Sequence, residues 1–321
     1  MTETAPFFAT LADGPSGGRA FWLMTDDGVR IRIGLWPGGS KGTVVFLPGR
    51  TEYIEKYGRT ARELMARGWS VISLDWRGQG LSGRFLPDPM LGHVQQFSDY
   101  QRDLDALMEF VATEGEGQGL TGPLMLMSHS MGGLAGLQAL NRGLPFRAAV
   151  FSAPMWGIRI PLWRLPLAGM MRRLPMALPQ DQNYAPTARA KSYLLRTGFA
   201  ANHLTGCEET YSWLKGHLEA EPQLQLGGPS LGWLRSALRG CAMALQGPAP
   251  DVPAVIALGS EEHIVRAAPI RRRIRDWKNC RLDLYEGARH EVPMERAPHR
   301  ERFFDSADQL FSTWASRKLA G

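Results

Sequence analysis

The clearest candidate for chemistry in this sequence is a serine in a tight turn. Ser130 follows the apolar run 124–128 and precedes Gly132 and Gly133. An apolar strand, a turn of small residues and a helix form the context that presents a serine hydroxyl as a nucleophile. Such a turn needs small residues two positions before and after the serine, and Ser128 and Gly132 meet that need. We predict Ser130 as the nucleophile; the alternative is a glycine-terminated strand–helix junction with a surface serine.

An acid and a histidine follow this serine in the order that the chemistry needs. A serine hydroxyl becomes a good nucleophile when a histidine accepts its proton, and a carboxylate must orient that histidine. Glu261 and Glu262 come directly after the apolar run 255–258, and His290 follows the strand expected at 280–285 by a few residues. The carboxyl ends of parallel strands are where such folds place their chemistry. We predict Glu262 as the acid, with Glu261 as the alternative, and His290 as the base.

The other histidines are weaker candidates. His129 adjoins the predicted nucleophile, but a tight turn points its ring elsewhere. His263 is the main rival of His290, and its alternative role is packing beside the acid. No pair of histidines has the helical spacing of metal ligands, and the chain has no phosphate-binding loop or complete dinucleotide fingerprint. The sequence therefore predicts no metal and no cofactor.

Two backbone amides are needed to stabilise the oxyanion of a tetrahedral intermediate. One is expected from Met131, the residue after the nucleophile. The other is expected from Arg50, in the turn after the apolar run 43–47, where Gly49 lets the backbone approach closely. We predict the N–H groups of Arg50 and Met131 as the oxyanion hole.

The elements that must position these residues alternate between strands and helices. The runs 21–24 and 29–36 flank an Asp-Gly turn and predict an antiparallel hairpin. Helical patterns follow at 57–67, from 98 or 99, from 269 and after 298. This alternation predicts an α/β protein with a mainly parallel sheet covered by helices on both faces. The runs expected as parallel strands are 43–47, 70–74, 124–128, 148–152, 253–258 and 280–285.

A long segment interrupts this alternation. The rhythm of strands and helices stops after residue 152 and resumes at residue 253. The sequence between is rich in Pro, Met, Trp and Arg. We predict a core formed by residues 1–153 and 247–321, with residues 154–246 inserted as a helical cap.

The first part of the insertion, 155–178, mixes large apolar side chains with arginines and prolines. Over the catalytic edge of the sheet, it would offer an apolar underside to an acyl chain and a basic rim to a headgroup. We predict Met155, Trp156, Arg172 and Arg173 as substrate-binding residues. The alternative is that the Trp and Met side chains only pack the cap and that the arginines are solvated.

Charge and composition narrow the class of partner. The chain has 321 residues and a formal net charge of +6, and residues 154–246 hold ten Lys and Arg against five Asp and Glu. This local excess allows peripheral contact with a membrane surface, whereas a nucleic-acid binder would need a recognised reading module. No apolar run reaches the roughly 18 residues of a membrane span, and the N-terminus does not resemble a signal peptide. With three widely spaced cysteines as free thiols, we predict a cytoplasmic protein of undetermined oligomeric state.

Several motifs together resemble a known family. They are LPGRTE at 47–52 with Tyr57, DWRGQGLS at 75–82, the turn around Ser130, GSEE at 259–262 and EGARH at 286–290. The chain, from residue 30 to its C-terminus, resembles the serine-aminopeptidase-type branch of the α/β hydrolases, which includes monoacylglycerol lipases and bacterial lysophospholipases.

The resemblance implies the α/β-hydrolase fold, a mostly parallel sheet with helices on both faces and an inserted helical cap. It also implies that an oxyanion amide, the acid and the base fall on Arg50, Glu262 and His290. The chain departs from the pattern in two places. Many relatives have His-Gly where this chain has Pro48 and Gly49, and Asp is commoner than Glu at the acid.

These features predict a serine hydrolase that cleaves a carboxylic ester through an acyl-serine intermediate. The favoured substrate is a lysophospholipid or a monoacylglycerol, because the PGRTE form is closer to bacterial lysophospholipases. A carboxylesterase for small esters and a peptidase acting at an N-terminal residue are the alternatives among enzymes. A hydrolase-fold protein that binds ligands without turnover is the alternative outside enzymes.

Overall fold

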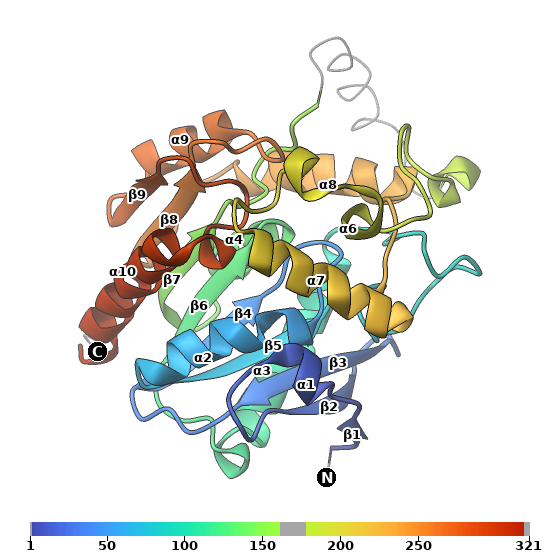
Figure 1. Ribbon diagram of the computed structural model, residues 1–321. Helices are drawn as coiled ribbons and strands as arrows, with labels where there is room; N and C mark the ends of the chain where they lie inside the picture. Colours follow the sequence, from blue (N-terminus) through green and yellow to red (C-terminus); the bar gives the residue numbers. More distant parts are fainter. Residues whose placement is uncertain (1, 161–177, 318–321) are drawn as a thin grey trace.

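The computed structural model describes residues 2–160 and 178–317, and a nine-stranded sheet forms its centre (Figure 1). The strand order is β1-β2-β3-β5-β4-β6-β7-β8-β9. The three pairs from β1 to β5 are antiparallel and the five later pairs are parallel, which confirms the predicted hairpin and the mainly parallel sheet. The strands are β1 Thr4–Ala5, β2 Arg19–Met24, β3 Arg30–Trp36, β4 Gly42–Leu47, β5 Trp69–Asp75, β6 Leu124–His129, β7 Phe146–Ser152, β8 Ala254–Gly259 and β9 Cys280–Tyr285.

Helices cover both faces of the sheet, and each face has its own apolar core. Val44 and Val45 are neighbours on β4 but belong to different clusters of buried residues, because successive side chains of a strand point to opposite faces. Helices α3, α4 and α9 supply buried residues to the cluster around Val45, and α2 and α10 supply them to the cluster around Val44. These helices are α2 Gly58–Ala66, α3 Asp99–Thr113, α4 Met131–Asn141, α9 Ala267–Arg275 and α10 Ala297–Ala315. The fold class is the one that the sequence predicts.

The segment between β7 and β8 does not add a strand to this sheet in the ranges that the structure describes. Its described helices are α6 Tyr193–Arg196, α7 Glu208–Ala220 and α8 Leu231–Ala244, and they lie at the end of the sheet from which β6 runs into α4 (Figure 1). Helix α8 contacts α4, and a Cβ at Gly240 would lie 3.3 Å from the ring of Phe97. The boundaries 154–246 for a separate cap remain a prediction.

Three further features of the fold concern the N-terminal elements, the cysteines and the character of the helices. The short strand β1 and helix α1 (Ala9–Ala12) precede the hairpin, and no pattern in the sequence predicts them. Cys207, Cys241 and Cys280 are all free. No helix in the described ranges combines the length and the apolar character needed to cross a bilayer.

Candidate active site

Ser130 occupies a strained turn between β6 and α4. Its backbone φ of 49° and ψ of −113° lie outside the regions that a serine normally adopts. Two hydrogen bonds hold it there: the Ser130 N–H donates to the Ser152 carbonyl at 3.0 Å, and the Met155 N–H donates to the Ser130 carbonyl at 2.8 Å. The surrounding strands therefore impose the conformation that exposes the hydroxyl at the end of the sheet.

The small residues around the turn are required by close approach of the chain. A Cβ at Gly132 would lie 2.1 Å from the carbonyl oxygen of Leu47, so only glycine fits where α4 passes the end of β4. Ser128 is completely buried, and a Cβ at Gly136 would lie 3.5 Å from its Oγ. A serine side chain is therefore small enough for position 128.

His290 and Glu262 form a buried hydrogen-bonded pair. His290 Nδ1 lies 2.6 Å from Glu262 Oε2, and both side chains are less than 5% exposed. The other carboxylate oxygen, Glu262 Oε1, accepts the N–H groups of Ile264 at 2.5 Å and Val265 at 3.0 Å. These bonds fix the carboxylate, which in turn orients the imidazole and leaves its Nε2 for proton transfer.

The pair shifts both pKa values in the direction that this role needs. Burial alone lowers the pKa of His290, but the adjacent Glu262 carboxylate outweighs it and holds the pKa above its usual value. Burial alone raises the pKa of Glu262, but His290 and the two backbone N–H groups hold it below its usual value. Glu262 therefore stays ionised at neutral pH, where it would stabilise a positive charge on the His290 imidazole.

The two alternatives raised by the sequence lie elsewhere. Glu261 is 55% exposed, and its carboxylate is 3.8 Å from Arg289 Nε. His263 Nδ1 lies 2.8 Å from Arg159 Nη1, and Arg159 also donates to the carbonyl of Glu262. We therefore propose Glu262 and His290, rather than Glu261 or His263, as acid and base.

This assignment predicts the pH profile. The rate should fall as pH drops through the pKa of His290, because only the neutral imidazole accepts the serine proton, and the midpoint should lie above about 6.5. Glu262→Gln should lower that midpoint and reduce kcat on the order of 10³- to 10⁴-fold, because the charged partner is lost. The matched control Glu261→Gln should stay within about twofold of the wild type. Stopped-flow or steady-state kcat/KM from pH 5 to 9 measures both effects, and reversed behaviour of the two variants would make Glu261 the acid.

The turn after β4 is arranged for the second oxyanion amide. The N–H of Gly49 donates to the Glu52 carboxylate, and the N–H of Thr51 donates to Gln79 Oε1 at 2.5 Å. Among the described residues, no acceptor is found for the N–H of Arg50, which lies between them. We propose that this N–H and that of Met131, the first residue of α4, bind the oxyanion.

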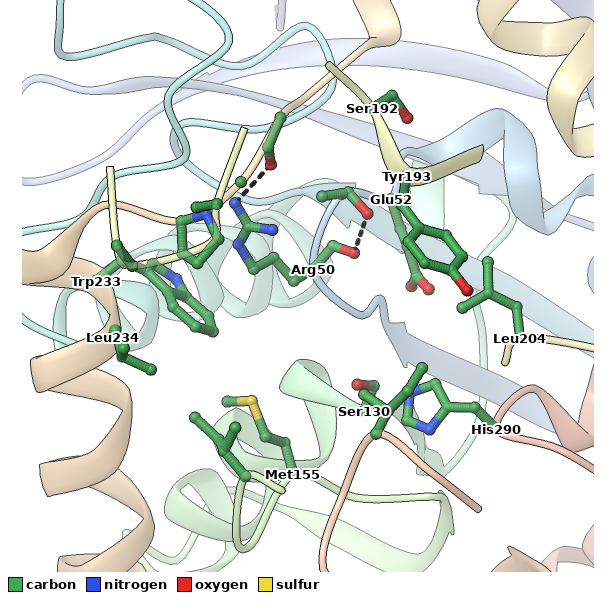
Figure 2. A pocket seen from close by; sticks show the side chains of 18 of the residues that line it. Arg50, Glu52, Ser130, Met155, Ser192, Tyr193, Leu204, Trp233, Leu234 and His290 are labelled. Carbon is green, nitrogen blue, oxygen red and sulfur yellow. Dashed lines mark hydrogen bonds between the residues drawn. The ribbon is translucent and has the colours of Figure 1, made fainter. Parts of the chain in front are cut away.

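A cavity of about 710 Å³ opens beside these groups and is lined by both Ser130 and His290 (Figure 2). Met155 lines it, as its predicted role requires, together with side chains of the insertion such as Tyr193, Trp233 and Leu234. This volume is in the range of sites for small organic ligands.

The prediction for Trp156 needs correction. Its side chain is 1% exposed, its indole N–H donates to the Gly133 carbonyl at 2.9 Å, and it stacks on Trp277 in the core. Because its polar atom is already bonded and its ring is packed in the core, it supports the turn around the serine instead of contacting substrate. Arg172 and Arg173 lie outside the described residues.

A buried charged cluster behind the candidate site escaped the sequence analysis. Lys56 Nζ lies 2.8 Å from Glu52 Oε1 and 2.7 Å from Glu291 Oε1, and all three side chains are almost fully buried. His129 lies beside the cluster, with its ring centroid 4.7 Å from that of His290. Burial lowers the pKa of His129 to about 3, so it stays neutral. The ligand atoms of Glu52, His129 and Glu291 lie within 4.8 Å of one another, but the Lys56 ammonium already binds both carboxylates.

The sheet, the strained serine turn and the buried His–carboxylate pair define the class of the protein, an α/β hydrolase with serine chemistry. The family described as "Serine aminopeptidase, S33" matches residues 38–297, and the chain belongs to this family. Lysophospholipase L2 of Escherichia coli (strain K12) is 30% identical over 270 residues, which cover 79% of this chain and 75% of the relative. Probable lysophospholipase L2 of Haemophilus influenzae is 26% identical, over 84% of this chain and 83% of the relative.

Solved structures agree on the fold. A soluble variant of monoglyceride lipase from Saccharomyces cerevisiae, solved with a substrate analogue, has a TM-score of 0.72 at 20% identity over 92% of this chain and 95% of its own. The monoacylglycerol lipase of Paleococcus ferrophilus has a TM-score of 0.66 at 18% identity, over 88% of this chain and 98% of its own. Both comparisons therefore support the α/β-hydrolase fold of this chain.

Proposed function

We propose that the protein hydrolyses the carboxylic ester of a monoacyl lipid, either a lysophospholipid or a monoacylglycerol. The observation that carries this proposal is a cavity with apolar walls that include Met155 and Leu234. This cavity lies beside Ser130 and the hydrogen-bonded Glu262–His290 pair. The names of the relatives support it: they include lysophospholipases and monoglyceride lipases.

The proposed reaction has two steps. His290 Nε2 takes the proton of Ser130 Oγ as that oxygen attacks the ester carbonyl, and the N–H groups of Arg50 and Met131 bind the oxyanion. The tetrahedral intermediate collapses, His290 gives the proton to the departing alcohol oxygen, and the acyl group stays on Ser130. A water then gives a proton to His290 and attacks the acyl-serine. His290 returns this proton to Ser130 Oγ as the acyl–oxygen bond breaks, which releases the fatty acid and restores the hydroxyl.

The arrangement of charges disfavours an aminopeptidase. Recognition of a peptide N-terminus would need a carboxylate that is free to bind an ammonium group. The carboxylates among the described residues that line the cavity are Glu52 and Glu291, and both already bind Lys56. An ester substrate needs no such carboxylate.

The proposed function also includes a role for the inserted segment and a location for the protein in the cell. We propose that residues 154–246 act as the cap over the site, since Tyr193, Trp233 and Leu234 of this segment line the cavity. The exposed cations Arg189 and Lys191 at the same cavity support peripheral contact with an anionic lipid surface. A cytoplasmic location is proposed from the sequence alone.

A series of p-nitrophenyl esters from acetate to decanoate tests the lipid character of the site. Each methylene buried should contribute about 0.8 kcal/mol, so kcat/KM should rise severalfold per added carbon and then level off. Leu234→Ala should flatten this rise, because it removes apolar wall from the cavity. The control is Met24→Ala, at a side chain that is 62% exposed and outside the cavity. A profile that declines from acetate onward would instead identify a small-ester hydrolase.

A further inference from the structure

The side chain of Arg50 enters the same cavity from the turn whose N–H is proposed for the oxyanion hole. Its Nη2 donates to the carbonyl of Gly227 at 2.8 Å, and its Cζ lies 5.1 Å from the ring centroid of Trp233. A Cβ at Gly92 would lie 2.2 Å from Nη2, so the backbone there comes as close as glycine allows. Figure 2 shows the guanidinium turned toward Trp233 and away from Glu52. The group is therefore held in one place on the cavity wall.

Arg50 is partly buried and has no carboxylate partner among the described residues. Arg84 and Arg273 likewise bind only backbone carbonyls in that part of the chain, but neither of them lines the cavity. Arg32 pairs with Glu55 and Asp75, Arg77 with Asp27 and Asp103, and Arg235 with Asp181. The Nε of Arg50 is buried without a hydrogen-bond partner in that part of the chain. A charge that is partly removed from water without a counter-ion is costly, and the Arg50 charge lies on the wall of the cavity, so an anion that arrives with a ligand would offset this cost.

The guanidinium keeps its charge in this environment. Burial lowers the pKa of Arg50 to about 10, which still leaves it protonated at neutral pH. A guanidinium has a planar set of donors that matches phosphate oxygens, and such bonds are stronger when they are taken out of water.

The other cations of the cavity are engaged or solvated. Lys56 binds two carboxylates, and Arg159 donates to the Glu262 carbonyl. Arg189, Lys191 and Arg196 are exposed, so water and salt screen their charge. Of the cations that line the cavity, Arg50 is thus the one best placed to distinguish an anionic ligand from a neutral one.

The spacing fits one kind of substrate. In a lysophospholipid, the path from the ester carbonyl carbon to the phosphorus spans roughly 7 Å when extended, and an arginine spans roughly 6 Å from Cα to Cζ. An ester carbonyl at the N–H of Arg50 would therefore leave the phosphate within reach of the guanidinium of the same residue. We propose that Arg50 binds the phosphate of a lysophospholipid substrate and selects it over a neutral monoacylglycerol, an inference that rests on the proposed lipid-ester hydrolysis.

The test compares lysophosphatidylcholine and monoacylglycerol with the same acyl chain. Arg50→Gln should lower the ratio of their kcat/KM values about 10- to 100-fold, because a hydrogen-bonded charge pair is lost with the first substrate only. Arg50→Lys should recover part of the ratio. The matched control Arg189→Gln, an exposed cation at the same cavity, should change the ratio less than about threefold. An equal loss on both lipids in Arg50→Gln would overturn the proposal and leave Arg50 with the structural role of holding Gly227.

A second measurement separates this proposal from the proposed function. Hydrolysis of p-nitrophenyl butyrate, a neutral ester, should be inhibited competitively by sn-glycerol 3-phosphate in the wild type and at least about 10-fold more weakly in Arg50→Gln. Weaker inhibition by inorganic phosphate than by glycerol 3-phosphate would identify a headgroup site; equal inhibition by the two would identify a free-phosphate site and overturn the headgroup proposal. If neither lipid is hydrolysed but p-nitrophenyl butyrate is, the lipid function fails, and the inhibition result still decides whether Arg50 binds phosphate.

Discussion

Replacing Ser130 with alanine is expected to lower kcat by about 10⁴-fold or more, with the fold intact. The hydroxyl is the atom that would carry the acyl group, and no other group in the turn can replace it. An alanine side chain fits the space of the serine, so the strained turn and its bonds to Ser152 and Met155 should persist. Steady-state kinetics on a p-nitrophenyl ester, with circular dichroism and Tm as checks on folding, measure the effect.

His290→Ala is expected to produce a loss of the same size. The double variant should lose little more than either single one, because nucleophile and base act as a unit. Retained activity in a folded single variant, or losses that multiply in the double variant, would show that the two residues do not work together.

Lys56→Met should destabilise the protein more than any surface substitution. The change leaves Glu52 and Glu291 buried without their shared ammonium, and breaking a buried ion pair from one side costs about 3–5 kcal/mol. Urea denaturation measures the free energy of unfolding. The control is Lys41→Met, because Lys41 is 40% exposed and pairs with Asp308 at the surface, so its loss should cost less than about 1 kcal/mol.

The deficit of Lys56→Met should depend on pH. Without the ammonium, burial and mutual repulsion raise the folded-state pKa values of Glu52 and Glu291 above the unfolded value of about 4.3. Folding then favours the protonated acids, so the stability of the variant should fall as pH rises through those raised pKa values, and the deficit should be larger at pH 8 than at pH 5. A deficit that is the same at both pH values would contradict the assigned charges.

Much of the fold could be predicted because it depends on local patterns. The parallel strands β4 to β8 are almost wholly buried, so they appear in the sequence as short apolar runs, whereas β9 at the edge of the sheet is partly exposed. The predicted boundaries of all six strands fall within about two residues of the observed ones. The candidate residues Ser130, Glu262 and His290 could be located because each closely follows a predicted strand.

Other features depend on contacts between distant segments. Lys56 and Glu291 are 235 positions apart, so nothing in the local sequence links them. The sequence places Trp156 at the substrate because it begins a segment rich in Trp and Met, but its contacts with Gly133 and Trp277 bury it in the core. The isolation of the Arg50 guanidinium from any carboxylate of the described residues is likewise a property of the folded cavity.

Labelling with a fluorophosphonate tests the central claim most directly. This reagent phosphonylates a serine that an adjacent base activates, so the wild type should gain one adduct by intact mass, and peptide mapping should place it on Ser130. Labelling should slow as the pH drops below the pKa of His290 and should be abolished in Ser130→Ala. An adduct on another serine, or undiminished labelling of Ser130→Ala, would contradict the assignment of Ser130 as the nucleophile.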